Sequence, residues 1–418
     1  YYLIAITMAA LFSIPDTRLF GFTSSTLLLG FLFVSYLLFL KYKIPKEYLK
    51  FNFAFIFLLI FSIIILLFKM PEYDSTDISY IIARIRDLFA ELLFVLILYF
   101  IVLKSKPRLE IVRKFIEIYF LLNAIYYVLK LTSKSVVVFF HQSINKVYTL
   151  SNFEVGREAF LGWEPSYTVP LSILFCLLYM LIYTNKLYMF LVFTFTIFIF
   201  ILGLSKTSFI MLFIMALMGV YFYLNNRILN RIFIKVSIIF LFLICLLLIL
   251  NYLETTFGIF SFDSTDKTEQ YKIISFLTRS QLILESGNQL IKFPFGYGLG
   301  NSIIVLSNYI DSNIMDFMSS YEIVESTKYT RTPKSQLLEY FLSGGIIFIV
   351  LFILHLKFIN KILKDIENKN IRQKVLLIQI LLLITVLFGE RIPYLLIMNI
   401  LLIVLLIIKE NKGYINEK

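Results

Sequence analysis

The chain has 418 residues, of which 60% are hydrophobic and 16% are charged. A soluble globular domain is roughly one quarter charged, so this composition excludes an ordinary soluble protein and predicts an all-α polytopic membrane protein. The net charge is +12, but the basic residues collect in alternate loops. The charge therefore reflects membrane topology and gives no support for nucleic-acid binding.

Twelve stretches of the sequence approach the roughly twenty apolar residues that a spanning helix needs. They lie near residues 1–14, 22–40, 51–69, 81–103, 112–130, 165–184, 187–204, 206–224, 234–252, 335–356, 375–388 and 394–408. The loops divide the chain into three parts. Residues 1–253 hold nine spans and a loop at 131–164, residues 254–334 form one large polar loop, and residues 335–418 hold three spans and a tail.

Lys and Arg outnumber Asp and Glu in one set of alternate loops. This set comprises 41–50, 104–117, 185–186, 225–235, 357–374 and the tail from 409. The positive-inside rule places these segments in the cytoplasm, together with both termini. The large loop 254–334 and the loop 131–164 then lie outside the cytoplasm. The segment 357–374, rich in Lys, Asn and Glu, is predicted to be a solvated cytoplasmic turn.

The sequence predicts neither a metal site nor a disulfide. His141 and His355 are the only histidines and lie on different segments, so they form no metal-binding cluster. Cys176 and Cys245 both lie in apolar runs. They are interpreted as core residues, which leaves no cysteine for a disulfide in the polar loops.

Charged residues avoid the middle of the predicted spans and collect at their outer ends. In the fourth span, Arg84, Asp87 and Glu91 follow i, i+3, i+7 spacing and share one face of a helix. Because charge in a bilayer is costly, such a face must look into the bundle or into a water-filled cavity. An internal ion-pair set that fixes helix packing and a ligand site are both open interpretations.

Four predicted helix starts on the outer side carry proline or hydroxyl residues, which are ordinary start signals. Cations accompany them, although a helix N-terminus is partly positive and already favours an anion. These cations are Lys206, Arg331, Lys334 and Arg391. A bound phosphate or pyrophosphate would offset the repulsion, and a carboxylate of the protein is the rival partner.

Glu164 lies at the start of the sixth predicted span, where a helix N-terminus favours the ionised carboxylate. Beside a cavity, such a carboxylate can orient or deprotonate a hydroxyl group. It can equally cap its helix or pair with Arg157. Trp163, the only tryptophan, lies next to it and either anchors the chain at the membrane interface or stacks on a sugar ring.

Residues 271–292 of the large loop are predicted to form an amphipathic helix, with Leu282 and Leu290 among its apolar positions. This helix could lie on the membrane surface or cover a cavity. Arg279 on it would contact solvent, lipid headgroups or a ligand. The glycines of residues 296–300 follow, but no βαβ pattern surrounds them, so they are not a nucleotide-binding loop. They are predicted to form a turn that returns the helix to the bundle.

Several segments together resemble the Wzy O-antigen polymerases and their relatives, the O-antigen ligases. Residues 162–167, Gly-Trp-Glu-Pro-Ser-Tyr, open the sixth span, and residues 204–208, Leu-Ser-Lys-Thr-Ser, open the eighth. In the large loop Arg279 is followed by residues 294–301, which are similar to the family's P-x-x-G-x-G turn. Residues 334–346 resemble the start of the family's next span. The order and spacing of these motifs, with the hydropathy pattern, cover most of the chain.

One position departs from the family's pattern. Many relatives carry a histidine near the start of the span after the large loop, where this chain has Lys334. The departure puts a histidine base in doubt and weighs against the ligase.

The resemblance implies an integral glycosyltransferase with a GT-C-like helical fold at the periplasmic face of the bacterial inner membrane. It would act in lipopolysaccharide biosynthesis, transferring a growing glycan from undecaprenyl pyrophosphate to the non-reducing end of a lipid-linked repeat unit. Its partners would be lipid-linked oligosaccharides, membrane lipid, a chain-length regulator and a flippase. No cofactor is expected, because the lipid pyrophosphate is itself the activated donor.

Under this hypothesis Glu164 is the first candidate and Glu158 the second to orient or deprotonate the acceptor hydroxyl. Trp163 and Tyr167 would stack on sugars. The cations expected to bind the departing pyrophosphate are Arg157, Arg279, Arg331, Lys334, Lys206 and Arg84. The alternatives are a ligase, which differs in using lipid A–core as acceptor, and a flippase, which should place charge along a central path.

Overall fold

The computed structural model describes residues 44–104, 108–133, 165–183, 185–203, 282–306, 335–366, 368–388 and 394–410, and the positions 5, 6, 9, 18, 19, 22, 23, 211 and 333. In these ranges the chain is helical, except for turns and one small hairpin. The hairpin pairs β1 (Arg18–Leu19) with β2 (Phe22–Thr23) in antiparallel register. The sequence predicted no strand, and β2 takes the first two residues of the span expected at 22–40.

The third to seventh and the last three of the predicted spans coincide with helices. The elements are α3 (Lys46–Lys69), the 3-10 turn η1 (Met70–Glu72), α4 (Ser75–Lys104), α5 (Arg108–Thr132), α7 (Pro165–Ile182), α8 (Lys186–Gly203), α12 (Ser302–Leu306), α14 (Gln336–Lys364), α15 (Lys369–Phe388) and α16 (Tyr394–Glu410). The other four predicted spans fall almost wholly outside the described residues.

Four of the described helices are long and apolar enough to cross a membrane. They are Lys46–Glu72, Leu109–Thr132, Gln336–Lys364 and Lys369–Leu387. Two apolar helices, Thr168–Ile182 and Leu187–Gly203, are shorter. Apart from the β1–β2 hairpin, the all-α prediction is therefore confirmed for the described residues, and their composition is that of a membrane protein.

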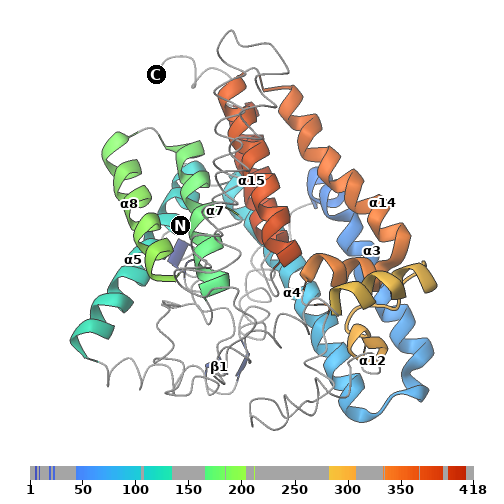
Figure 1. The fold of residues 1–418 in the computed structure, drawn as a ribbon. Coiled ribbons are helices and arrows are strands. Elements are labelled where there is room, and N and C mark those ends of the chain that lie inside the picture. The colour runs from blue at the N-terminus through green and yellow to red at the C-terminus, as the bar shows by residue number, and fades with distance from the viewer. Residues whose placement is uncertain are drawn as a thin grey trace, which may run out of the picture.

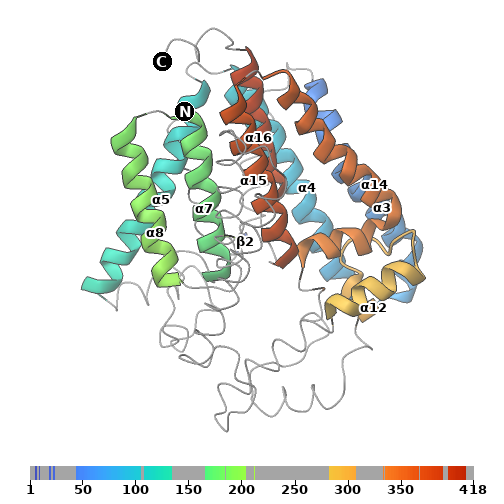
Figure 2. The ribbon, with the colours of Figure 1, turned by 45° about the horizontal axis from the view of Figure 1, so that its top comes forward.

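The helices form two groups joined by a central pair (Figure 1). On one side α3 packs against α4 and α14, and on the other α7 packs against α5 and α8. Helices α15 and α16 lie between these groups, with α15 against α7 and α14 and with α16 against α4 (Figure 2). The starts of α4, α7, α14 and α16 share one end of the bundle, called here the loop end.

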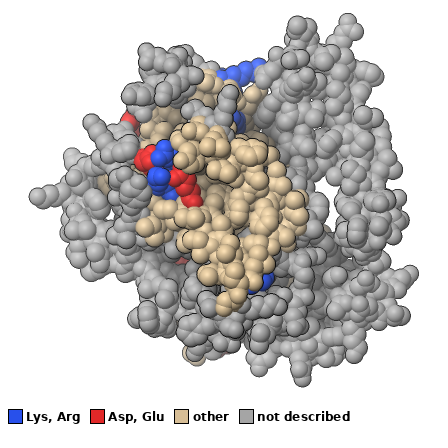
Figure 3. Space-filling view, turned by 90° about the vertical axis from the view of Figure 1, so that its left-hand side faces the viewer, with Lys and Arg blue, Asp and Glu red and all other residues tan. Residues whose placement is uncertain are grey.

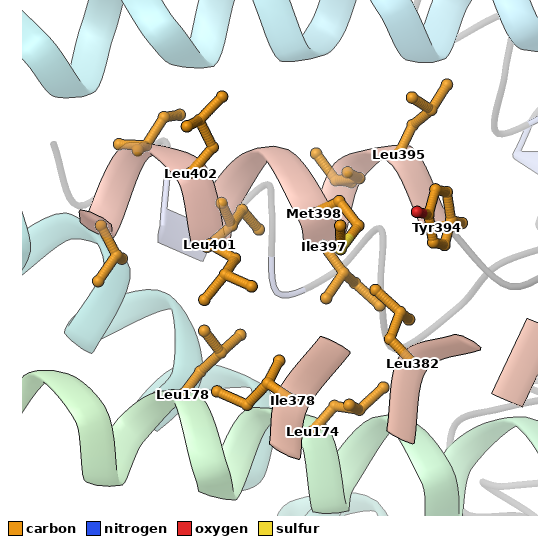
Figure 4. Close-up of a cluster of buried hydrophobic side chains, with 14 of the residues drawn as sticks. Leu174, Leu178, Ile378, Leu382, Tyr394, Leu395, Ile397, Met398, Leu401 and Leu402 are labelled. Atoms are coloured by element: carbon orange, nitrogen blue, oxygen red, sulfur yellow. The ribbon is translucent and has the colours of Figure 1, made fainter. Parts of the chain in front are cut away.

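Helix α16 is the centre of the core. Almost every side chain from Tyr394 to Ile408 is buried, so the helix contacts protein on all sides. Figure 4 shows Ile397 and Leu401 facing Leu174 and Leu178 of α7 and Ile378 of α15, while Leu395 and Leu402 point to the opposite side of the helix. A helix that is apolar all round is the kind that a large bundle buries.

One polar contact crosses this core. Asn52 of α3 and Asn399 of α16 are both fully buried, and each donates its side-chain amide to the other, at 2.9 and 2.8 Å. Each amide also donates to a carbonyl of its own helix, that of Tyr48 or Leu395. Because a buried amide without partners is costly, this pair fixes the register of α16 against α3.

A second polar group joins α5 to α7. The Glu117 carboxylate accepts from the Tyr179 hydroxyl at 3.0 Å and from Lys114 Nζ at 2.8 Å. Arg113 lies 3.4 Å from the same carboxylate and over the ring of Tyr183. On the side where α5 and α8 lie, the described surface is otherwise mostly uncharged (Figure 3). Exposed Phe190 and Ile201 of α8 are typical of a face toward lipid.

The segment 357–374 is not the solvated turn that its composition predicted. Helix α14 continues to Lys364 and α15 begins at Lys369, so the turn is only a few residues long. Ile359 and Leu363 are buried against the bundle, and Lys361 and Lys364 lie in the last turn of α14. Apolar contacts on one face and cations at the helix C-terminus both favour the longer helix.

Helix α14 is broken at Gly345, whose φ of 63° and ψ of −160° are not helical. A turn formed by residues 293–301, called here the glycine turn, docks on this break. The N–H groups of Tyr297 and Gly298 donate to the carbonyls of Leu342 and Ser343, at 3.1 and 2.8 Å. In an unbroken helix those carbonyls would accept from residues four positions later.

Helix α14 also donates a hydrogen bond to the glycine turn, and the turn bonds to α3 as well. The Ile346 N–H donates to the Pro294 carbonyl at 2.7 Å. The Leu299 N–H donates to the Ser62 hydroxyl of α3 at 2.8 Å. The glycine turn thus replaces the helical hydrogen bonds that the break removes. The predicted return of the loop to the bundle is confirmed for residues 282–306.

We expect Gly345→Ala to destabilise the protein strongly. A Cβ at this position would lie 2.3 Å from the Pro294 carbonyl oxygen, and the backbone conformation is one that only glycine adopts readily. The expected loss in the free energy of unfolding is about 3 kcal/mol or more. Thermal unfolding in detergent measures it.

The matched control is Gly287→Ala, where a new Cβ would meet nothing within 4 Å. Because glycine costs about 0.5–1 kcal/mol relative to alanine inside a helix, this variant should be neutral or slightly more stable. Equal melting temperatures for the two variants would contradict the docking of the glycine turn on α14.

Candidate functional site

Most of the site residues predicted from the sequence lie outside the described ranges. They are Glu164, Glu158, Arg157, Arg279, Arg331, Lys334, Lys206 and Trp163. Tyr167 belongs to the first turn of α7, but its side chain is not described. Arg84 is therefore the one predicted site residue whose contacts the described part of the chain shows.

Two of the undescribed residues border described helix starts at the loop end. Helix α7 begins at Pro165, directly after Glu164, as the sequence predicted. Helix α14 begins directly after Ser335, which follows Lys334, and the Ser335 hydroxyl caps the helix by accepting from the Leu338 N–H. Proline at the first helical position and serine at the cap explain both starts.

Arg84 of α4 pairs with Glu339 of α14 at the loop end. Arg84 Nη2 lies 3.6 Å from Glu339 Oε1, and the two side chains are 22% and 12% exposed. Arg84 Nε also donates to the Tyr80 hydroxyl at 3.2 Å, and its guanidinium lies over the Tyr80 ring. Of the two interpretations left open by the sequence, the structure supports an ion pair that joins two helices.

The rest of the charged face of α4 divides between the bundle and the surface. Glu91 Oε1 accepts from the Leu396 N–H at 3.2 Å, in the first turn of α16. A carboxylate there satisfies a free N–H and meets the positive end of the helix dipole. Asp87 instead pairs with its neighbour Arg86 at 3.0 Å, and its side chain is 44% exposed. Arg84 and Glu91 thus contact other helices of the bundle, as one of the two predicted settings requires, whereas Asp87 is half-exposed.

The first turn of α14 carries further buried polar groups beside this pair. The Gln336 amide donates to the Tyr340 hydroxyl at 2.8 Å. Gly300 of the glycine turn lies against Ile81 and Arg84 of α4. Buried Asn301 and Ser302 follow Gly300 directly. We call Arg84, Glu339, Gln336, Asn301 and Ser302 the Arg84 cluster.

Four acceptor oxygens of the Arg84 cluster are buried and take part in no hydrogen bond among the described residues. They are Asn301 Oδ1, Ser302 Oγ, Gln336 Oε1 and Glu339 Oε1. A buried acceptor without a donor costs about 1–3 kcal/mol. The Arg84–Glu339 distance also exceeds the roughly 2.7–2.9 Å of a charge-assisted hydrogen bond. The described residues therefore supply no donor to these four buried oxygens.

Glu339 and Gln336 were not among the sequence-predicted site residues. The available signal was that Glu339 is the only charged residue in the predicted span 335–356. The rule that picked out Arg84, Asp87 and Glu91 applies equally to this carboxylate. Sequence alone could not show that it lies opposite Arg84, because the two residues are on helices far apart in the chain.

Comparisons with known proteins identify no relative. No family model matches the sequence, and no curated protein or solved structure matches it. The resemblance to the O-antigen polymerases therefore depends on the residues of the chain itself.

We expect Arg84→Met to destabilise the protein, because it leaves the Glu339 carboxylate without its cationic partner. Removing one partner of a largely buried ion pair typically costs about 3 kcal/mol, because the other charge loses its compensation. Adding Glu339→Gln removes the stranded charge, so the double variant should recover much of the lost stability. Melting temperatures of the wild type, both single variants and the double variant in detergent measure the coupling.

Lys409→Met is the matched control. It breaks the pair between Lys409 and Asp365, whose side chains are 42% and 48% exposed. An exposed pair contributes about 0–1 kcal/mol, so little change is expected. If the effects of Arg84→Met and Glu339→Gln were simply additive, the two side chains would not interact as the structure indicates.

Proposed function

We propose that this chain is an integral-membrane glycosyltransferase that polymerises a surface polysaccharide, in the manner of the O-antigen polymerases it resembles. The observation that carries the proposal is the Arg84 cluster at the end of an apolar bundle. Sugars present many hydroxyl donors, which suit buried oxygens that lack them. The apolar walls of the bundle suit the polyprenyl chain of a lipid-linked substrate.

In this proposal the chain has twelve spanning helices in a GT-C-like arrangement. It lies in the inner membrane of a bacterium, with both termini in the cytoplasm. The loop end faces the periplasm, so the large loop 254–334 lies beside the Arg84 cluster. This orientation follows from the basic residues of the alternate loops.

The reaction joins a growing glycan to the next repeat unit. A hydroxyl at the non-reducing end of the repeat unit attacks the anomeric carbon of the glycan on its carrier. The bond from that carbon to the pyrophosphate oxygen breaks, and undecaprenyl pyrophosphate leaves with the bonding electrons. The hydroxyl proton passes to a carboxylate, with Glu164 as first candidate and Glu158 as second.

Negative charge develops on the leaving pyrophosphate, and positioned cations stabilise it. The candidates are Arg157, Arg279, Arg331, Lys334 and Lys206, with Arg84 as a further one. Because Glu339 already offsets the charge of Arg84, this guanidinium is a weaker anion site than a cation without a carboxylate. Its pairing favours a role in holding sugar hydroxyl groups beside Glu339.

The purified protein should elongate glycans without any other protein. We expect proteoliposomes that contain the protein and an undecaprenyl-pyrophosphate-linked repeat unit, without lipid A–core, to give a ladder of lipid-linked glycans on a gel. Single units that remain unchanged until lipid A–core is added would instead identify a ligase. Repeat units that change leaflet without elongation would identify a transporter.

Glu164→Gln should lower the rate of elongation more than it lowers stability. Loss of a group that acts directly in the transition state typically costs about a hundred- to a ten-thousandfold in rate. The matched control is Glu410→Gln, at the last residue of α16 and away from the loop end. Normal polymer length and yield from well-expressed Glu164→Gln would exclude this carboxylate as the base.

A further inference from the structure

Residues 282–292 form a helix whose surface has three distinct sectors. Leu282, Ser286 and Gln289 are buried against the bundle. The remaining surface is divided between an apolar edge and a polar edge. Because consecutive helical residues are separated by about 100°, neighbours such as Ile291 and Lys292 fall on different edges.

The apolar edge is strongly exposed. Leu284 is 70% exposed and Ile291 is 81% exposed. The chain that leaves the helix adds Phe293 and Phe295, the latter 71% exposed. Large apolar side chains gathered on one surface mark a binding surface for a protein or a membrane.

The polar edge includes Glu285 and Asn288, which bond to each other, and Glu285 also bonds to the buried Gln289. Glu285 accepts from the amide groups of Asn288 at 3.2 Å and Gln289 at 2.8 Å. Lys292 is exposed on the same edge. A helix with one apolar and one polar edge suits the boundary between lipid and water.

The helix also has the orientation that this boundary requires. In Figures 1 and 2 the yellow-orange segment beside α12 runs across the ends of α3 and α14 rather than along them. The helix thus lies transverse to the two long helices that are apolar enough to span a membrane.

The exposed apolar residues continue onto those two helices. Pro294, next to Phe295, accepts from the Ile346 N–H of α14, and Ile346 is itself exposed. The glycine turn contacts α3 at Ile65. Two residues of α3 close to this contact, Leu67 and Phe68, are exposed. Exposed apolar residues on a spanning helix face lipid, so the same lipid surface reaches the transverse helix.

We propose that residues 282–295 lie in the lipid–water interface of the membrane, with Leu284, Ile291, Phe293 and Phe295 inserted among the lipids. The apolar edge is continuous with the apolar surfaces of α3 and α14, which face lipid. We therefore infer that the bilayer, and not a protein partner, covers this edge. The polar edge formed by Glu285, Asn288 and Lys292 faces water. This proposal does not depend on the enzymatic activity.

Tryptophan fluorescence in proteoliposomes tests the proposal with the full-length chain. Trp163→Phe first removes the only native tryptophan. Ile291→Trp and, in a separate variant, Phe295→Trp then report on the apolar edge. Lys292→Trp is the matched control on the polar edge, and Ile60→Trp, at an exposed position in the middle of α3, reports on the bilayer interior.

We expect lipids brominated near the headgroup to quench the fluorescence of Ile291→Trp and Phe295→Trp more than that of Lys292→Trp. Iodide in the water should quench Lys292→Trp most. Lipids brominated near the chain ends should quench Ile60→Trp most. Each variant is first compared with its Trp163→Phe parent in melting temperature, and Phe295→Trp provides a second reporter if Ile291→Trp fails to fold.

Two results would overturn the proposal. Strong iodide quenching of Ile291→Trp and Phe295→Trp without bromolipid quenching would place the apolar edge in water. Protection of both variants from both quenchers would show that a protein surface, from this chain or a second copy, covers this edge.

Discussion

In an apolar bundle every backbone N–H and C=O group needs a partner within the protein, and the break in α14 meets this need through the glycine turn. The carbonyls of Leu342 and Ser343 accept from the turn, and the Ile346 N–H donates to it. Irregular backbone at membrane depth is tolerated only where such partners exist. The break and the turn therefore depend on each other. Because the turn also bonds to Ser62 of α3, this one contact fixes a loop segment against two long helices.

Charged and amide side chains determine which helices meet and in which register. Arg84 joins α4 to α14, Glu91 joins α4 to α16, and the Asn52–Asn399 pair joins α3 to α16. Apolar contacts alone would tolerate a helix shifted by one turn, whereas a buried polar group left without its partner would not. The Arg84 cluster is therefore a packing contact between helices, and it also holds buried acceptors for which the described residues supply no donor.

The sequence correctly predicted the features that neighbouring residues determine, such as the starts of helices. Helix α7 begins at Pro165 and α14 begins directly after Ser335, as expected. Capping residues and first-turn proline stabilise a helix start through contacts within a few residues of the chain. The sequence did not predict the contact of the glycine turn with Gly345, or that Glu339 is the partner of Arg84. Both contacts join segments far apart in the chain, and a single sequence contains no measure of that proximity. The extension of α14 to Lys364 was also missed. Residues 357–364 are rich in charge, and their apolar face is recognisable only from the neighbouring helices that bury it.

The transverse helix, the glycine turn and the Arg84 cluster form one connected path. The Tyr297 hydroxyl donates to Gln289 of the helix at 3.0 Å, and the Tyr297 N–H donates to α14 at the break. Three residues further, Gly300 lies against Arg84. If the helix rests in the lipid–water interface, this path holds the Arg84 cluster at a fixed depth near the membrane surface. That is the depth at which the pyrophosphate of a lipid-linked sugar lies, since its polyprenyl chain must remain among the lipids while its sugars remain in water.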